Sequence, residues 1–258
     1  MSNHQQLEFR VLGSVEVLRQ GRPRTPSAPK QRAVLALLIL HANEFVPMNR
    51  LVDDLWGPRS PARAVAGLQV YIGALRKVLP LAGATGGAPA IETCPNGYLL
   101  RVPPEQIDLY RYRRLAAEGD RALTEGRPER ASALLDAALA LWRGPALADL
   151  TTIGQLGGYA ESLDAHRLSV IERRIEADLR LGRYAAVADE LEGLCQRHPL
   201  RESLHRQLMV AHWRCGRRAE ALATYQRVRH TLVDRLGLEP CEQLRAVQQA
   251  VLRDTEPT

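Results

Sequence analysis

Residues 60–80, SPARAVAGLQVYIGALRKVLP, decide the fold of the first part of the chain. Four apolar residues recur at the spacing of one helical face: Leu68, Ile72, Leu75 and Leu79. Ser60 is a candidate N-cap, Pro61 suits a first turn, and Pro80 closes the stretch. We therefore predict a helix over residues 62–79 whose leucine stripe faces a core.

The opposite face of this predicted helix has an unusual composition. It carries small, polar and basic residues, with Arg76 at its edge: Gln69, Val70, Gly73 and Lys77. A glycine inside a helix costs about 1 kcal/mol relative to alanine. Either this outer face is ordinary solvated surface, or a bulky and negatively charged partner comes close to it.

The neighbouring segments place this helix in a larger pattern. Residues 7–24 alternate apolar and polar side chains between glycines, which predicts short strands. Residues 27–43 and 49–56 read as two helices. Residues 91–102 place strand-like arms around Pro95-Asn96-Gly97, a strong hairpin signal. Strands, three helices and a hairpin form the layout of a winged helix-turn-helix, with the third helix as the reading helix and the hairpin as the wing.

Local signals mark the ends of the first two helices. Ser27 is a candidate N-cap with Pro29 in the first turn, and Asn43 is a candidate end of that helix. Asn49 is a candidate N-cap of the second helix, which Gly57 would follow.

From about Asp108 the pattern becomes helical throughout. The predicted helices are 108–125, 128–142, 157–182, 184–197, 201–215, 217–236 and 240–253. Similar segments surround Gly182 and Gly216, which are 34 residues apart, and Gly126 starts a looser copy. A period of 34 residues is typical of tetratricopeptide repeats, which stack helical hairpins into a concave surface. The expected fold is mainly α: a winged helix-turn-helix (α+β), then an all-α, tetratricopeptide-like domain.

Charge is distributed unevenly along the 258 residues. Residues 1–107 hold 12 Lys and Arg against 7 Asp and Glu, a net +5. Residues 108–258 hold 23 against 22, a net +1. Local basicity is the electrostatic footprint of a polyanion binder, although a simple surface imbalance gives the same count.

Several function classes find no support in the sequence. It has no phosphate-binding glycine loop, dinucleotide motif or nucleophile elbow, so we expect no enzyme and no cofactor. The cysteines form no C-x-x-C pair and have no histidines at zinc-ligand spacing, so we expect no metal. The N-terminus has no apolar signal-peptide core, and the apolar run 33–40 is too short to span a bilayer. We expect a cytoplasmic protein that does not enter the membrane.

Longer motifs carry a family resemblance. FRVLGSVEVLRQG, KQRAVLALLILHANEFV, LVDDLWG, LQVYIGALRKVL and IETCPNGYLLRV resemble the N-terminal part of the Streptomyces antibiotic regulatory protein family, which is similar to OmpR-type winged-helix domains. LWRGPALADL, EADLRLGRY, the segment 198–229 and LVDRLGLEP resemble the bacterial transcriptional activator domain. The resemblance covers residues 7–253. Cys94 and Tyr110 depart from the residues common in the family.

The resemblance implies a domain division and a function. An OmpR-type DNA-binding domain would span 1–107 and a bacterial transcriptional activator domain 108–258. Such proteins bind direct repeats in promoters, recruit RNA polymerase and usually control secondary-metabolite gene clusters. Two subunits would lie head-to-tail, about 10–10.5 bp apart. Larger relatives append further domains. Because this sequence stops at Thr258, we expect a member of the small, stand-alone class.

The winged-helix layout and the resemblance assign roles to the outer face. Gln69 would read adenine through its amide, Val70 would contact a thymine methyl, and Arg63 would reach guanine or a phosphate. Gly73 would let the DNA approach the helix closely.

Other side chains would hold the DNA backbone. Arg76 and Lys77, near the helix C-terminus, are expected to contact phosphates, which position a protein but specify no sequence. Arg50 at a helix start and Asn96 at the wing tip are further candidates for backbone contacts.

Two other functions stay open from the sequence. In one, the repeats form a scaffold or sensor, and the basic N-terminal domain docks a protein partner. In the other, the protein binds DNA but represses transcription, because the sequence does not encode the sign of regulation.

Overall fold

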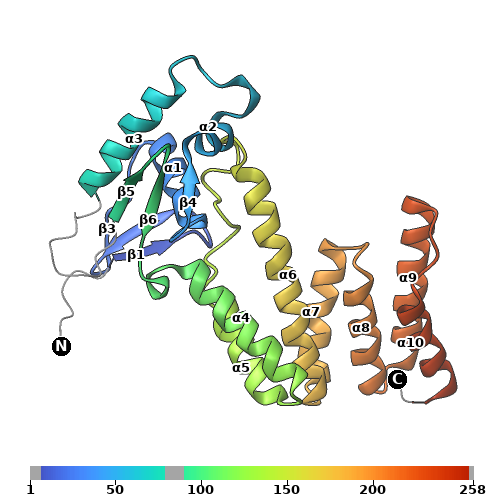
Figure 1. Ribbon diagram of the computed structural model, residues 1–258. Helices are drawn as coiled ribbons and strands as arrows, with labels where there is room; N and C mark the ends of the chain where they lie inside the picture. The colour runs from blue at the N-terminus through green and yellow to red at the C-terminus, as the bar shows by residue number, and fades with distance from the viewer. Residues whose placement is uncertain (1–6, 79–89, 256–258) are drawn as a thin grey trace, which may run out of the picture. The chain divides into compact units, whose positions relative to one another are not determined.

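The computed structural model describes residues 7–78 and 90–255 (Figure 1). The chain packs into two compact units, which are described separately. Unit 1 comprises residues 1–117 with 137–168, and unit 2 comprises 118–136 with 169–258. Helices α4 and α6 each pass from one unit into the other. These units are defined by packing; the division at residue 107, drawn from sequence similarity, stays a prediction.

In the described residues up to the hairpin, unit 1 forms two small antiparallel sheets and three helices. Its elements through the hairpin are β1 (Leu7–Arg10), β2 (Glu16–Arg19), β3 (Arg22–Pro23), α1 (Pro29–Leu40), β4 (Phe45–Pro47), α2 (Met48–Trp56), a 3-10 turn η1 (Gly57–Arg59), α3 (Ala64–Val78), β5 (Ala90–Cys94) and β6 (Gly97–Arg101). One sheet has the order β1-β2-β3, and the other has β4-β6-β5. A sheet, three helices and a hairpin confirm the predicted winged helix-turn-helix.

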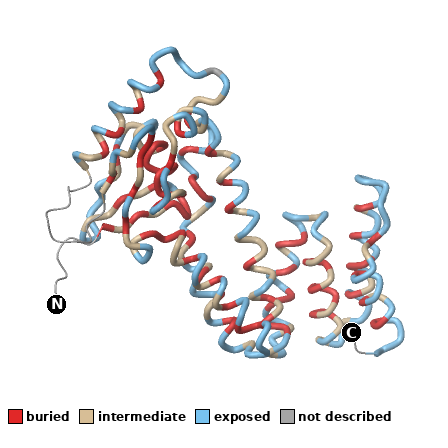
Figure 2. The backbone as a smooth tube through the Cα atoms, in the orientation of Figure 1, coloured by how far each residue is buried: buried red, intermediate tan, exposed pale blue. Residues whose placement is uncertain are grey.

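Helix α1 forms the centre of this unit. Every residue from Ala33 to Leu40 is buried, as expected of a helix that is apolar on all sides (Figure 2). Helices α2 and α3 and strand β6 all pack against it. Helix α3 contributes Leu68, Ile72 and Leu75, each at most 1% exposed, so its leucine stripe is a core face.

Two predicted N-caps are wrong. Helix α1 is preceded by Ala28, helix α2 by Pro47, and neither has a side-chain cap. The Met48 N–H instead donates to the Asn96 carbonyl at 2.8 Å, so α2 begins directly from a strand connection. Asn49 lies inside the helix, where its Oδ1 accepts from the Arg50 N–H.

Helix ends also differ in detail from the predictions. Helix α3 begins at Ala64, so Arg63 lies just before it, and Leu79 lies outside the described residues. Helix α1 ends at Leu40, and Asn43 occupies the following turn with a left-handed φ of 66°. Gly57 ends α2 as predicted.

The predicted hairpin is confirmed, but Gly97 acts differently from the Asn-Gly signal. Pro95 and Asn96 form the turn, and Asn96 holds the left-handed φ of 59°. Gly97 is the first residue of β6. A Cβ there would lie 2.3 Å from the Val46 carbonyl oxygen, so glycine allows β4 to approach. Strand β4 itself was not predicted.

After the hairpin, a 3-10 turn η2 (Pro104–Gln106) leads into the helical region. Its helices are α4 (Asp108–Thr124), α5 (Pro128–Leu139), α6 (Leu156–Arg180), α7 (Tyr184–Arg197), α8 (Glu202–Arg214), α9 (Arg218–Leu236) and α10 (Glu242–Arg253). None of the helices in the described ranges is long and apolar enough to cross a membrane.

Within unit 2, the predicted repeat is visible as one recurring turn. Gly126, Gly182 and Gly216 each have a left-handed φ between 71° and 75°. In each turn the next residue is an arginine whose N–H donates to a carbonyl five residues back, at 2.8–3.0 Å. This geometry ends one helix and starts its partner. It confirms the tetratricopeptide-like hairpins.

Candidate nucleic-acid interface

The outer face of α3 is open to solvent. Gln69, Gly73 and Lys77 are exposed, and Val70 is 67% exposed. This valine lies on the same face of the helix as the Gln69 amide and the Lys77 ammonium group. Helix α3 contains no acidic residue. This face therefore offers a hydrogen-bonding amide, an apolar contact and positive charge together.

Gly73 has no internal reason to be glycine. A Cβ built at this position would meet nothing within 4 Å in the described part of the chain. No close internal contact therefore accounts for a residue that weakens the helix. The packing of the described residues is compatible with the predicted explanation for this glycine, which is close approach of an external partner.

Arg76 lies at the edge of this face and contacts the wing. Its Nε and Nη2 donate to the Ile91 carbonyl at 3.0 and 2.8 Å, and Nη2 also donates to Thr93 Oγ1 at 2.7 Å. Arg76 thereby fixes α3 against β5, a positioning role that the sequence did not indicate. Its predicted phosphate contact stays a prediction beside this role.

Arg63 is exposed in the turn immediately before α3. Its carbonyl accepts the Gly67 N–H at 2.9 Å, the first bond of the helix ladder. Its side chain therefore leaves the N-terminal end of α3, whereas Lys77 lies at the opposite end. Arg63 and Lys77 therefore lie at opposite ends of α3.

Arg50 and Asn96 lie near each other although they are 46 residues apart in sequence. The bond from Met48 N–H to the Asn96 carbonyl places the wing turn at the start of α2, two residues from Arg50. Both Arg50 and Asn96 are exposed. The Arg50 Nη2 also donates to the Tyr159 hydroxyl at 3.3 Å, and its Nε lies 3.7 Å from Asp54 Oδ2.

An aromatic stack beside the face was missed. The Trp56 ring stacks on Tyr71 of α3 at 6.4 Å, with 25° between their planes. The Lys30 ammonium lies 5.2 Å from the centre of the Trp56 ring. This stack links the end of α2 to α3, and Lys30 adds a positively charged side chain from α1. No sequence signal marks such a contact, because its three residues come from three separate helices.

The LWRGPALADL motif, between α5 and α6, is bonded to the β1–β2 connection and to α1 of the same unit. Arg143 N–H donates to the Leu12 carbonyl at 2.9 Å, and Asp149 accepts from Val15 N–H at 2.9 Å and Arg32 Nε at 2.8 Å. The motif is therefore a structural clamp within unit 1.

Asp108 forms a second contact of this kind. Its carboxylate accepts the Val11 and Leu12 N–H groups at 3.0 Å. Burial nevertheless raises the pKa of Asp108 above its usual range, because removing the charge from water outweighs these bonds.

Comparison with known proteins identifies the family. Residues 107–252 match the family described as bacterial transcriptional activator domain, and residues 22–100 match transcriptional regulatory protein, C terminal. Regulatory protein DnrI of Streptomyces peucetius is 43% identical over 251 residues, 96% of this chain and 92% of DnrI. The chain belongs to the Streptomyces antibiotic regulatory protein family. It is a transcriptional regulator by that membership.

Other members of this family extend beyond the matched region. Regulatory protein AfsR of Streptomyces coelicolor is 38% identical over 252 residues, which are 96% of this chain but 24% of AfsR. The solved structure of Mycobacterium tuberculosis EmbR in complex with a low affinity phosphopeptide superposes with a TM-score of 0.91 at 36% identity. The superposition covers 98% of this chain and 66% of the EmbR chain.

Proposed function

We propose that this regulator binds promoter DNA by placing helix α3 in the major groove, which is wide enough to admit a helix. The observation that carries the proposal is the open face of α3, with exposed Gln69, Val70 and Lys77 around an unobstructed Gly73. The net charge of +5 on residues 1–107 supports a polyanionic partner.

The proposed division of labour follows from side-chain chemistry. Gln69 reads adenine, Val70 contacts a thymine methyl, and Arg63 reaches a guanine or a phosphate at the other end of the helix. Lys77 and Arg76 hold phosphates. Because α2 and the wing turn are joined at Met48, Arg50 and Asn96 contact the backbone from one side.

The family membership supports the wider proposal. The regulator activates transcription from direct repeats by recruiting RNA polymerase, and its targets are genes of secondary metabolism. Two subunits occupy adjacent repeats head-to-tail. A promoter-binding role requires a cytoplasmic location. The domain division at residue 107 assigns DNA binding to the first part and activation to the second.

Footprinting on the promoters that flank its own gene tests DNA binding. We expect protection of two repeats about one helical turn apart, lost steeply as salt rises, since phosphate contacts release counterions. The absence of any salt-sensitive footprint would overturn the proposal in favour of a scaffold or sensor. Transcription with purified polymerase then tests the sign: more transcript supports activation, and less transcript identifies a repressor.

A further inference from the structure

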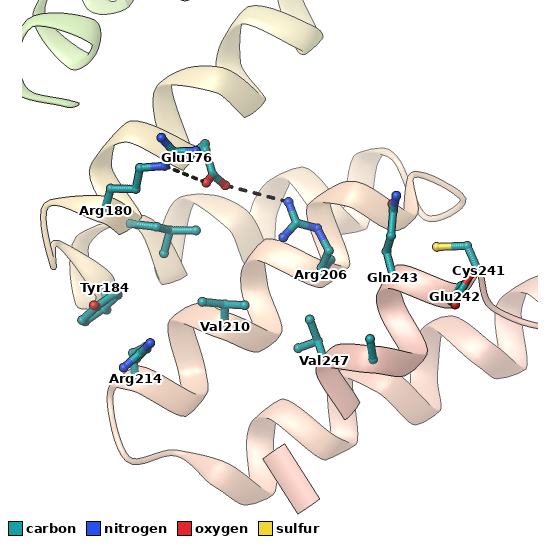
Figure 3. Close-up of a pocket in the computed structure, with 12 residues that line it drawn as sticks. Glu176, Arg180, Tyr184, Arg206, Val210, Arg214, Cys241, Glu242, Gln243 and Val247 are labelled. Carbon is teal, nitrogen blue, oxygen red and sulfur yellow. Dashed lines mark hydrogen bonds and ion pairs between the residues drawn. The ribbon is translucent and has the colours of Figure 1, made fainter. Parts of the chain in front are cut away.

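A groove lies within unit 2. It has a volume of about 1120 Å³ and is lined mainly by α6 and α8, the first helices of two successive hairpins, and by the following helix α10 (Figure 3). Figure 3 shows Arg206, Val210 and Arg214 along α8, with Val247 opposite on α10. Along α8 the groove is therefore lined by an arginine, a valine and a second arginine at intervals of four residues, a spacing that places them on one face of the helix.

The repeat places two of the arginines in equivalent positions. Arg180 on α6 and Arg214 on α8 each come two residues before the turn glycines Gly182 and Gly216. Both line the groove. Stacking equivalent hairpins therefore directs bases from successive repeats to the same surface.

Positive charge is in excess along the groove. Three arginines line it against two glutamates, Glu176 and Glu242. Glu176 is shared, because its carboxylate lies 3.1 Å from Arg180 Nε and 3.8 Å from Arg206 Nη2. Arg180 also donates to the Leu123 carbonyl at 3.1 Å, so Arg206 is the more loosely held of the two.

The spacing of the bases indicates the kind of ligand. Arg206 and Arg214 are eight residues apart, or about 12 Å along a helix axis. An extended ligand can contact both guanidinium groups along this span, one at each end. A peptide with two carboxylates and an apolar side chain between them matches both ends and the intervening Val210.

We propose that this groove binds an acidic, partly apolar peptide segment of a partner protein. Two carboxylates pair with Arg206 and Arg214, and an apolar side chain packs on the partly exposed Val210 between them. The site does not depend on DNA binding by α3, so it stands or falls separately from the proposed function.

Selection from a random 12-residue peptide library tests this on the full-length protein, with excess duplex DNA present to occupy basic surfaces. We expect selected peptides to be enriched in Asp and Glu on either side of an apolar residue. A representative fluorescent peptide should bind the wild type in an anisotropy titration. The double variant Arg206→Gln, Arg214→Gln should weaken that binding at least about tenfold, because two charge-assisted hydrogen bonds are lost.

Matched controls separate the groove from general charge. Arg245→Gln on α10 removes an exposed base that does not line the groove and should leave affinity unchanged. Replacing the peptide's Asp and Glu by Asn and Gln should weaken binding to the unaltered protein by a similar factor, which guards against misfolding of the variant. Selection of no peptide, selection without acidic enrichment, or equal affinity for the double variant would each overturn the proposal.

Discussion

Gln69 is the residue on which base preference is expected to depend. It is exposed on the face of α3 that carries no acidic residue, and its amide can both donate to and accept from adenine. We predict that Gln69→Ala relaxes selectivity at one base position and costs about 1–3 kcal/mol on the preferred sequence. Affinities for a set of single-base promoter variants would measure this. Equal weakening on every variant would show that Gln69 does not read a base. Gln249→Ala, at an exposed position on α10, is the control and should leave DNA affinity unchanged.

At Gly73, substitutions that stabilise the fold are expected to weaken DNA binding. Because a Cβ there meets nothing within 4 Å, Gly73→Ala should raise the free energy of unfolding by about 1 kcal/mol through helix propensity. Gly73→Glu should also raise the free energy of unfolding, by less than Gly73→Ala, yet abolish DNA binding by bulk and charge. Gly73→Gln separates the two causes, since it keeps the bulk alone. Wild-type DNA affinity in all three variants would mean that this face never meets DNA.

Arg76 and Lys77 are neighbours with different expected effects. Lys77→Ala should flatten the dependence of log affinity on log salt by about one unit, because one phosphate contact is lost. Arg76→Ala should lower the free energy of unfolding by about 1–2 kcal/mol, because its bonds to Ile91 and Thr93 disappear. The salt slope and urea unfolding measure the two effects. An unchanged slope would remove Lys77 as a contact, and unchanged stability would remove Arg76 as a link.

At the scale of elements, helix α8 carries a buried histidine that couples folding to pH. Burial lowers the pKa of His205 below its usual 6.5, and its Nε2 lies 3.2 Å from the Pro199 carbonyl. The unfolded chain therefore binds a proton at higher pH than the folded chain. The resulting loss of stability is absent well above pH 6.5 and grows as pH falls through that value toward the folded pKa.

We predict that urea unfolding at pH 7.5 and 5.5 shows lower stability at the acid value, and that His205→Gln reduces the difference. Glutamine keeps a donor for the Pro199 carbonyl but does not titrate. The pKa values of His41, His166 and His212 are also lowered mainly by burial, so part of the acid loss should persist in the variant. An identical pH difference in variant and wild type would show that His205 does not contribute.

The sequence predicted secondary-structure elements well where a hydrophobic periodicity runs over many residues. It predicted them poorly where contacts with distant parts of the chain determine where an element begins. The stripe of Leu68, Ile72 and Leu75 predicts α3 because burial and helical spacing coincide. Strand β4 has three residues, Phe45–Pro47, too few for an alternating pattern to register. The predicted cap of α2 fails because the Asn96 carbonyl, 48 residues away in sequence, accepts the Met48 N–H at the start of that helix.

In the candidate site, too, some features could be predicted from the sequence and others could not. Exposure of Gln69, Val70 and Lys77 could be inferred because it is the complement of the buried stripe. The bonds of Arg76 to β5 could not, since an arginine bonded to a neighbouring strand and one in solvent look alike in sequence. The stack of Lys30 on Trp56 likewise exists only in three dimensions.

At the scale of the whole molecule, the proposed head-to-tail arrangement of two subunits makes a prediction about DNA spacing. Repeats about 10–10.5 bp apart place two subunits on one face of the duplex. Inserting 5 bp between the repeats would rotate the second subunit to the opposite face and separate the contacting surfaces. We expect the second subunit to bind about 5–150-fold more weakly, the usual range of a coupling energy of 1–3 kcal/mol.

Quantitative footprinting at both repeats would measure this loss, because it reports each occupancy separately. Replacing 5 bp of flanking DNA outside the repeats is the matched control and should change neither occupancy. Inserting 10 bp restores the face but not the distance, so binding should stay weak if the subunits touch directly. Equal affinity at both repeats after the 5 bp insertion would mean that the subunits bind independently, and the head-to-tail contact would have to be abandoned while DNA recognition by α3 stood.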